Sequence, residues 1–205
     1  MVRVKICGIT NVADARAAAA LGADALGFNF VRGSRRYVTP EMAKAIIVAL
    51  PPFVVPVGVF ADAPITQVRE ICDFCGIQTV QLHGDESPAY VARLHHYRRI
   101  KAVRVATLED LRLLERYTVD AYLLDAKVPG ELGGTGESFD WNLAAEGRRH
   151  GLIILAGGLT PENVAEAVRR ARPYAVDVAS GVEVEPGIKD RHLIAAFVAA
   201  AKSAV

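Results

Sequence analysis

Short apolar, β-branched runs alternate with alanine-rich or charged segments of helical period along the whole chain. The apolar runs predict eight strands, at about residues 2–7, 24–30, 54–60, 78–82, 99–105, 120–125, 152–156 and 175–179. The segments between them predict helices. This alternation is typical of a parallel sheet, because parallel neighbours must be joined by a crossover connection.

Three predicted helices have marked starts. Thr10 and Asn11 can each cap a helix that covers residues 13–21, and Gly22 suits the left-handed position beyond its end. Pro40 and Pro161 each follow a threonine, so we expect them at the first position of two further helices.

The length of the chain favours closure of the sheet. Eight βα units within 205 residues leave almost no room for a second domain, and 52% of the residues are hydrophobic. We therefore expect an α/β fold, a (βα)8 TIM barrel that forms a single domain over residues 1–205. An open doubly wound sheet is the alternative architecture.

The charge balance gives no reason to expect a nucleic acid or a membrane as partner. Lysine and arginine (24) nearly cancel aspartate and glutamate (23), and no segment reaches the roughly 18 apolar residues of a membrane span. The start of the chain lacks the apolar stretch of a signal peptide, and three cysteines form no disulfide framework. We expect a cytoplasmic protein, either a monomer or a homodimer.

In a βα barrel the functional residues lie where the strands end, at their carboxyl ends. Strand side chains alternate, so Lys5 and Cys7 share the face that points into the barrel, and Asp125 ends its own strand on the equivalent face. A thiol and a carboxylate at one mouth are candidates for a base and an acid. The plainer alternatives are a buried structural cysteine and an aspartate that caps a loop.

Two glycine-containing loops follow the last two strands, where barrels often bind phosphate. Gly157 and Gly158 lie in the first loop, and Ser180 and Gly181 in the second. Glycines let backbone amides approach an anion closely, although glycine is also ordinary in tight turns. The pair of loops favours a phosphate site.

Local positive charge follows the second strand, in the loop that contains Arg35 and Arg36. A guanidinium can hold a carboxylate through two parallel hydrogen bonds, and we favour Arg36 for this role and solvent exposure for Arg35. The glycine-rich run at 133–136, with Gly134, is expected to fold over a ligand; a plain flexible connection is the alternative.

Two other clusters are not expected to bind metal. Cys72 and Cys75 fall within a predicted helix and lack a second ligand pair, and His95 and His96 lie on a polar helix end. We expect no metal site.

Several of these motifs occur together in one known family. The chain resembles phosphoribosylanthranilate isomerase throughout its length, in the family's order, through segments 4–10, 34–37, 81–84, 124–125, 133–136, 139–141, 156–159 and 177–183. The family usually has proline at the position of Arg35 and often a basic residue at the position of Glu137. Both departures lie in loops and leave the acid, base and phosphate positions unchanged.

The resemblance implies an Amadori rearrangement of N-(5-phosphoribosyl)anthranilate, without a cofactor. It implies that Asp125 protonates the ring oxygen, that Cys7 removes the C2 proton, and that Arg36 holds the anthranilate carboxylate. Because an iminium intermediate accepts the electrons, neither a metal nor a Schiff-base lysine is needed. Further binding or loop-ordering roles are expected for Lys5, Gln81, His83, Arg104, Gly134 and Asp177.

Two other functions remain open at this point. One is a related sugar isomerase that performs the same rearrangement with two aspartates, against which Cys7 argues. The other is a non-catalytic phosphosugar-binding barrel, which would not need both Cys7 and Asp125.

Overall fold

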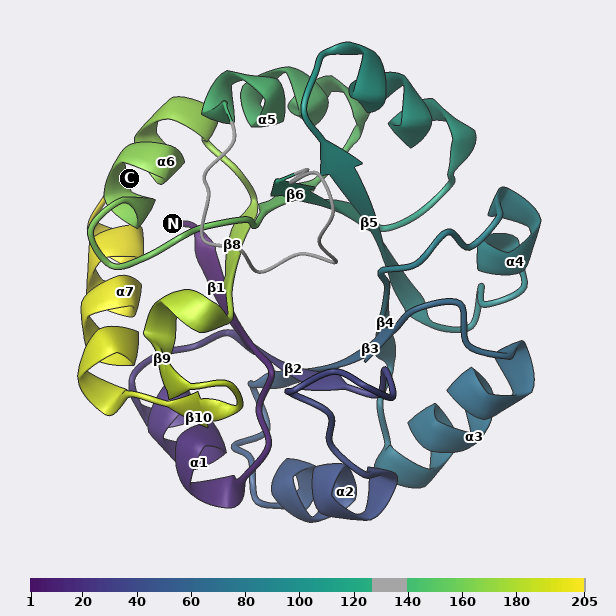
Figure 1. Cartoon of the computed structure of the whole chain (residues 1–205), viewed down its shortest axis with the longest axis vertical. Coiled ribbons are helices and arrows are strands. Elements are labelled where there is room, and N and C mark those ends of the chain that lie inside the picture. Colours follow the sequence, from purple (N-terminus) through teal and green to yellow (C-terminus); the bar gives the residue numbers. More distant parts are fainter. Residues whose placement is uncertain (127–139, 205) are drawn as a thin grey trace.

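The computed structural model describes residues 1–126 and 140–204, and they form a closed barrel of eight parallel strands (Figure 1). Neighbouring strands pair in sequence order, and the last pairs with the first, so the closed barrel is confirmed and the open sheet is not found. The strands are Arg3–Cys7 (β1), Ala25–Asn29 (β2), Val55–Phe60 (β3), Thr79–Leu82 (β4), Arg98–Val105 (β5), Ala121–Ala126 (β6), Ile153–Leu155 (β7) and Ala175–Val178 (β8).

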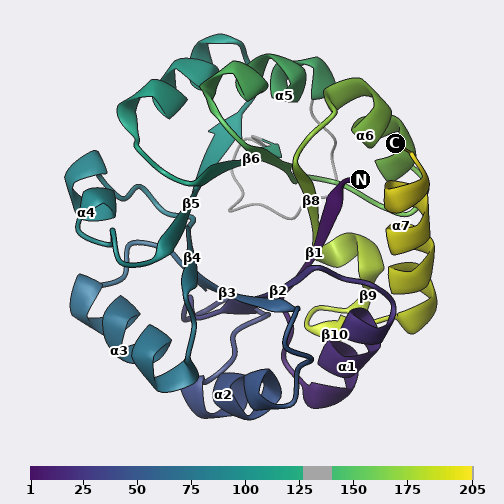
Figure 2. The same ribbon diagram turned by 180° about the vertical axis from the view of Figure 1, so that it is seen from behind.

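Helices form an outer ring around these strands, as the view from behind also shows (Figure 2). The α-helices are Val12–Ala20 (α1), Pro40–Val48 (α2), Ile65–Cys75 (α3), Pro88–Ala92 (α4), Trp141–Gly147 (α5), Val164–Ala171 (α6) and Arg191–Ser203 (α7). Short 3₁₀ helices cover Glu109–Arg116 (η1), Arg148–His150 (η2) and Ser180–Val182 (η3). No helix among residues 1–126 and 140–204 is long and apolar enough to cross a membrane.

After β8 the chain forms an antiparallel hairpin of Glu183–Glu185 (β9) and Ile188–Lys189 (β10). The hairpin lies beside β1 and α1 (Figure 1), because the Lys189 amide donates to the Asp14 carboxylate and the Lys189 ammonium donates to the Cys7 carbonyl. The sequence patterns did not predict this hairpin. It adds charged side chains to the barrel mouth.

Two of the three predicted helix starts are confirmed. The Asn11 side chain caps α1 by accepting from the amide of Asp14, and Thr39 caps α2 ahead of Pro40. The prediction for Pro161 is wrong, because α6 begins three residues later at Val164. The Asn163 side chain instead accepts from the Thr160 amide and donates to a carbonyl of the preceding loop, which holds residues 160–163 as a turn.

Apolar side chains fill both sides of the strands. Val4 and Ile6 are fully buried on the face of β1 that meets the helices, which confirms the predicted alternation. A separate apolar cluster fills the inside of the barrel and consists of Val57, Ile100, Ala102, Ala121, Leu123, Ile154, Ala156 and Ala175. This packed interior leaves the polar side chains to the carboxyl ends of the strands.

Candidate active site

The Cys7 thiol lies at the end of β1 beside a buried ion pair. Lys5 Nζ is 2.8 Å from Asp177 Oδ1, and the two residues are directly opposite each other where β1 pairs with β8. Gly27 of β2 makes room for both groups, because a Cβ atom there would lie 2.7 Å from Cys7 Sγ and 3.0 Å from Lys5 Nζ. The thiol, the ammonium and the carboxylate therefore share one enclosed space, as the strand alternation predicts for Lys5 and Cys7.

Opposing effects act on the proton of the Cys7 thiol. Burial raises its pKa above the ordinary value, nearby Asp177 adds to this rise, and the ammonium groups of Lys5 and Lys189 oppose it without cancelling it. Burial lowers the pKa of Lys5, but Asp177 and Cys7 outweigh burial and raise it overall. The thiol is therefore protonated in the free site, next to a stable cation that favours its ionised form.

Asp125 on β6 is buried at the same mouth, on a strand that does not pair with β1. Its Oδ2 lies 3.4 Å from His83 Nε2, and His83 Nδ1 lies 3.0 Å from Gln81 Nε2. If the Gln81 amide donates to Nδ1, the hydrogen-bond network places the imidazole proton on Nε2, toward Asp125. Gln81, His83 and Asp125 thus lie in one row of polar contacts at the barrel mouth.

The cleft beside His83 also contains Arg104 of β5. The cleft has a volume of about 420 Å³ and extends between the loops that follow β4 and β5. Its lining includes Lys101, Arg116 and Tyr117 as well as these two residues. Arg104 thus lines a cleft at the carboxyl ends of β4 and β5.

The two glycine loops touch each other directly. Gly157 and Gly158 have φ angles of +82° and +63°, which glycine adopts without strain, and Ser180 begins η3. A Cβ atom on Gly181 would lie 3.1 Å from the carbonyl carbon of Leu159 and still closer to its oxygen. The predicted phosphate loops therefore form one continuous surface.

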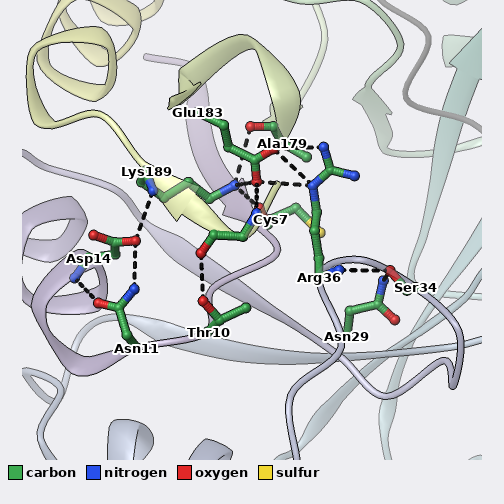
Figure 3. Close-up of polar contacts among 11 residues, drawn as sticks. Cys7, Thr10, Asn11, Asp14, Asn29, Ser34, Arg36, Ala179, Glu183 and Lys189 are labelled. Atoms are coloured by element: carbon green, nitrogen blue, oxygen red, sulfur yellow. Dashed lines mark hydrogen bonds and ion pairs between the residues drawn. The ribbon is translucent and has the colours of Figure 1, made fainter. Parts of the chain in front are cut away.

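Arg36 is tied to a glutamate that the sequence patterns did not select. Its Nε donates to Glu183 Oε1 at 2.9 Å and its Nη2 donates to Glu183 Oε2 at 2.7 Å (Figure 3). Lys189 Nζ lies 2.7 Å from the same Oε1, and its side chain is fully buried. Glu183 occurs within a family motif and Lys189 follows it closely, but only the hairpin shows that Glu183 lies between Lys189 and Arg36.

These three charged groups shift one another's pKa values. Burial alone would raise the pKa of Glu183, but Arg36 and Lys189 outweigh it and hold that pKa below its ordinary value. Hydrogen bonding to Glu183 raises the pKa of Arg36, whereas burial lowers the pKa of Lys189. Glu183 is therefore ionised at neutral pH.

The remaining sequence candidates lie elsewhere. Cys72 and Cys75 are buried in α3, away from the barrel mouth. Burial also raises the pKa of Cys72 to about 12, so this thiol is unreactive at neutral pH. Within the described ranges, no three His, Cys, Asp or Glu side chains are grouped as metal ligands. Gly134 and Glu137, with the rest of the expected ligand loop at 127–139, lie outside the described residues.

Comparisons with known proteins point to one family. A family model described as N-(5'phosphoribosyl)anthranilate (PRA) isomerase matches residues 4–200. A relative from Geobacter sp. (strain M21), N-(5'-phosphoribosyl)anthranilate isomerase, is 54% identical over 202 residues, or 98% of each chain.

Solved structures of similar proteins share the whole barrel. The phosphoribosyl anthranilate isomerase of Thermotoga maritima superposes with a TM-score of 0.93 at 43% identity, covering 99% of this chain and 100% of that one. A complex of such an isomerase with reduced 1-(o-carboxyphenylamino)-1-deoxyribulose 5-phosphate has a TM-score of 0.89 at 41% identity, with 99% and 100% coverage. A structure of monomers generated from the dimeric Thermotoga maritima protein superposes with a TM-score of 0.88 at 40% identity, with the same coverage.

Proposed function

Because the chain belongs to the N-(5'-phosphoribosyl)anthranilate isomerase family, we propose that Cys7 and Asp125 are the base and the acid of its reaction. The reaction is the aldose-to-ketose isomerisation of phosphoribosylanthranilate in tryptophan biosynthesis. Family membership decides against the two-aspartate sugar isomerase and the non-catalytic barrel. The geometry of the mouth supports the proposed roles of individual residues.

Asp125 acts first, by protonating the furanose ring oxygen of the substrate. The C1–O bond then breaks, and the nitrogen lone pair forms an iminium with C1. The burial of Asp125 at the barrel mouth and the 3.4 Å contact of its Oδ2 with His83 Nε2 support this role, because a general acid must be held within reach of the atom that it protonates.

Cys7 acts second: its thiol loses its proton to solvent, and the resulting thiolate removes the C2 proton. The C–H electron pair forms the C1=C2 bond while the iminium accepts the π electrons at nitrogen, which gives an enolamine. The enolamine becomes the ketone by losing its hydroxyl proton and gaining a proton at C1. The observation that carries the proposal is the thiol enclosed with the Lys5 ammonium over Gly27, because the ammonium stabilises the thiolate that this step requires.

Other residues hold the substrate. Arg36 binds the anthranilate carboxylate, and the loops of Gly157, Gly158, Ser180 and Gly181 bind the phosphate through backbone amides. Lys5, Gln81, His83, Arg104 and Asp177 order the sugar hydroxyls or the loops, and Gly134 belongs to the loop proposed to cover the ligand.

The test follows the loss of substrate fluorescence in the parent protein, Cys7→Ser and Asp125→Asn. We expect kcat to fall by about 10²-fold to 10⁴-fold in each variant, the usual contribution of a general acid or base. Cys72→Ala is the matched control, since this thiol is buried in α3 and should leave the rate unchanged. Rates near that of the parent in both site variants would disprove the assignment.

We further propose that the chain forms a homodimer in the cytoplasm, where its three free cysteines stay reduced. A dimeric relative supports the assembly, as does an exposed apolar stretch around Phe53, whose side chain is 94% exposed between α2 and β3. Light scattering should give a molar mass of about twice 22.0 kDa for the parent protein. The Phe53→Asp variant should have the mass of a single chain. A monomeric parent at micromolar concentration would refute the dimer.

A further inference from the structure

Glu183 is shared between two cations. Its carboxylate accepts hydrogen bonds from the Arg36 guanidinium and from the Lys189 ammonium (Figure 3). Throughout residues 1–126 and 140–204, no other carboxylate lies within 4.0 Å of either cation. One negative charge thus faces two positive charges, and the cluster keeps an excess positive charge that favours an anion.

The open part of this cluster is one edge of the Arg36 guanidinium. Glu183 occupies the edge formed by Nε and Nη2. On the edge formed by Nη1 and Nη2, Nη1 makes no hydrogen bond to any residue that the structure describes, and 17% of the Arg36 side chain is exposed. A guanidinium fork of this kind matches the two oxygens of a carboxylate.

The partner of Arg36 is rigidly held. Only 4% of the Glu183 side chain is exposed, and the amide of Gly187 donates to its Oε1 at 3.2 Å. On the other side, a Cβ atom at Gly8 would lie 2.5 Å from Arg36 Cδ, so the loop after β1 packs directly against the arginine. The direction of the open edge is therefore fixed before a ligand arrives.

We propose that Glu183 is a positioning residue for substrate specificity, which directs the open edge of Arg36 toward the anthranilate carboxylate. Lys189 balances the charge of Glu183, so the charge of Arg36 remains available to the ligand. The inference rests on the proposed role of Arg36 as the carboxylate-binding residue. Glu183 does not touch the substrate, and its effect should depend on whether the ligand carries that carboxylate.

The test compares two ligands that differ only in this group. One is reduced 1-(o-carboxyphenylamino)-1-deoxyribulose 5-phosphate, and the other is the same molecule with an unsubstituted phenylamino group. Calorimetry gives Kd for both with the parent, Arg36→Met and Glu183→Gln. For Glu183→Gln we expect binding of the carboxylate ligand to weaken by about 10-fold to 100-fold, the range of a charged hydrogen bond, and binding of the other ligand to change by less than about twofold.

The outcomes separate this inference from the role of Arg36. Equal weakening of both ligands by Arg36→Met would refute the carboxylate role itself. Selective weakening by Arg36→Met together with equal weakening, or none, by Glu183→Gln would overturn the inference about Glu183 alone. In the double variant Arg36→Met/Glu183→Gln, selectivity should fall no further than in Arg36→Met, and an additive loss would also overturn it.

A variant that keeps the charge covers the case in which Glu183→Gln does not fold, as judged by circular dichroism. Glu183→Asp keeps the carboxylate but withdraws it from the guanidinium by one methylene group. We then expect a loss of about 3-fold to 10-fold for the carboxylate ligand only, since the ion pair is lengthened rather than removed. Equal losses for the two ligands would overturn the inference.

Discussion

Replacing Gly181 with alanine should open the surface on which the two phosphate loops meet. The added Cβ would lie 3.1 Å from the Leu159 carbonyl carbon, 3.2 Å from Thr160 Cα, and inside 3.0 Å of the Leu159 oxygen, whereas ordinary contact begins at 3.4 Å. These atoms all belong to the backbone, so no side-chain rotation relieves the overlap. The loops must therefore separate by about 1 Å.

A displacement of this size should be costly for catalysis. A misplacement of about 1 Å can lower a rate about 10²-fold, which corresponds to about 2.7 kcal/mol of transition-state stabilisation. Because the phosphate is remote from the reacting carbons, we expect most of the effect as a higher KM and a smaller part as a lower kcat. Inorganic phosphate should also become a weaker competitive inhibitor.

Steady-state kinetics, followed by substrate fluorescence, measures these quantities. Gly76→Ala is the control, because Gly76 has a φ angle of +73° after α3 and a Cβ atom there meets nothing within 4 Å. In Gly76→Ala, backbone strain should lower the free energy of unfolding by about 1 kcal/mol, and the kinetic constants should stay unchanged. If Gly181→Ala kept the KM and the phosphate inhibition of the parent, the reasoning about the joined loops would be refuted.

Two further substitutions address the thiol. Gly27→Ala places a methyl group 2.7 Å from Cys7 Sγ. In the same assay, this variant should show a kcat about 10²-fold lower with little change in KM. An unchanged kcat would contradict the enclosed geometry of the thiol. Lys5→Met removes a cation that lowers the pKa of Cys7 and leaves Asp177, which raises it. The thiolate then forms only at higher pH, so the acid limb of the kcat/KM profile should move to higher pH. A limb that stayed in place or moved to lower pH would show that Lys5 does not stabilise the thiolate.

The residues that the sequence predicted well are those governed by local rules. Side chains alternate along any strand, so the inward direction of Lys5 and Cys7 follows from their spacing alone. The same rule, applied to β6, brought Asp125 to the mouth. Gly27 carried a signal that was not used, since a glycine inside a strand often marks a close approach by another group.

The contacts that the sequence did not predict depend on distant parts of the chain. Arg36 and Glu183 are 147 positions apart, and ion pairing has no sequence period that would connect them. The wrong helix start at Pro161 has a local cause of a different kind, because proline fits a turn as well as a first helical turn. There the side chain of Asn163 determines which of the two forms.

The order of the two chemical steps follows from the electrostatics of the mouth. Burial keeps the Cys7 thiol protonated in the free site, and a bound carboxylate and phosphate add negative charge that disfavours the thiolate further. Protonation of the ring oxygen by Asp125 creates an iminium cation next to the carbon that Cys7 must deprotonate. A nearby positive charge lowers the pKa of a thiol and at the same time acidifies the C2 proton. Ring opening therefore prepares both partners of the second step, and the thiolate becomes available only after the acid has acted.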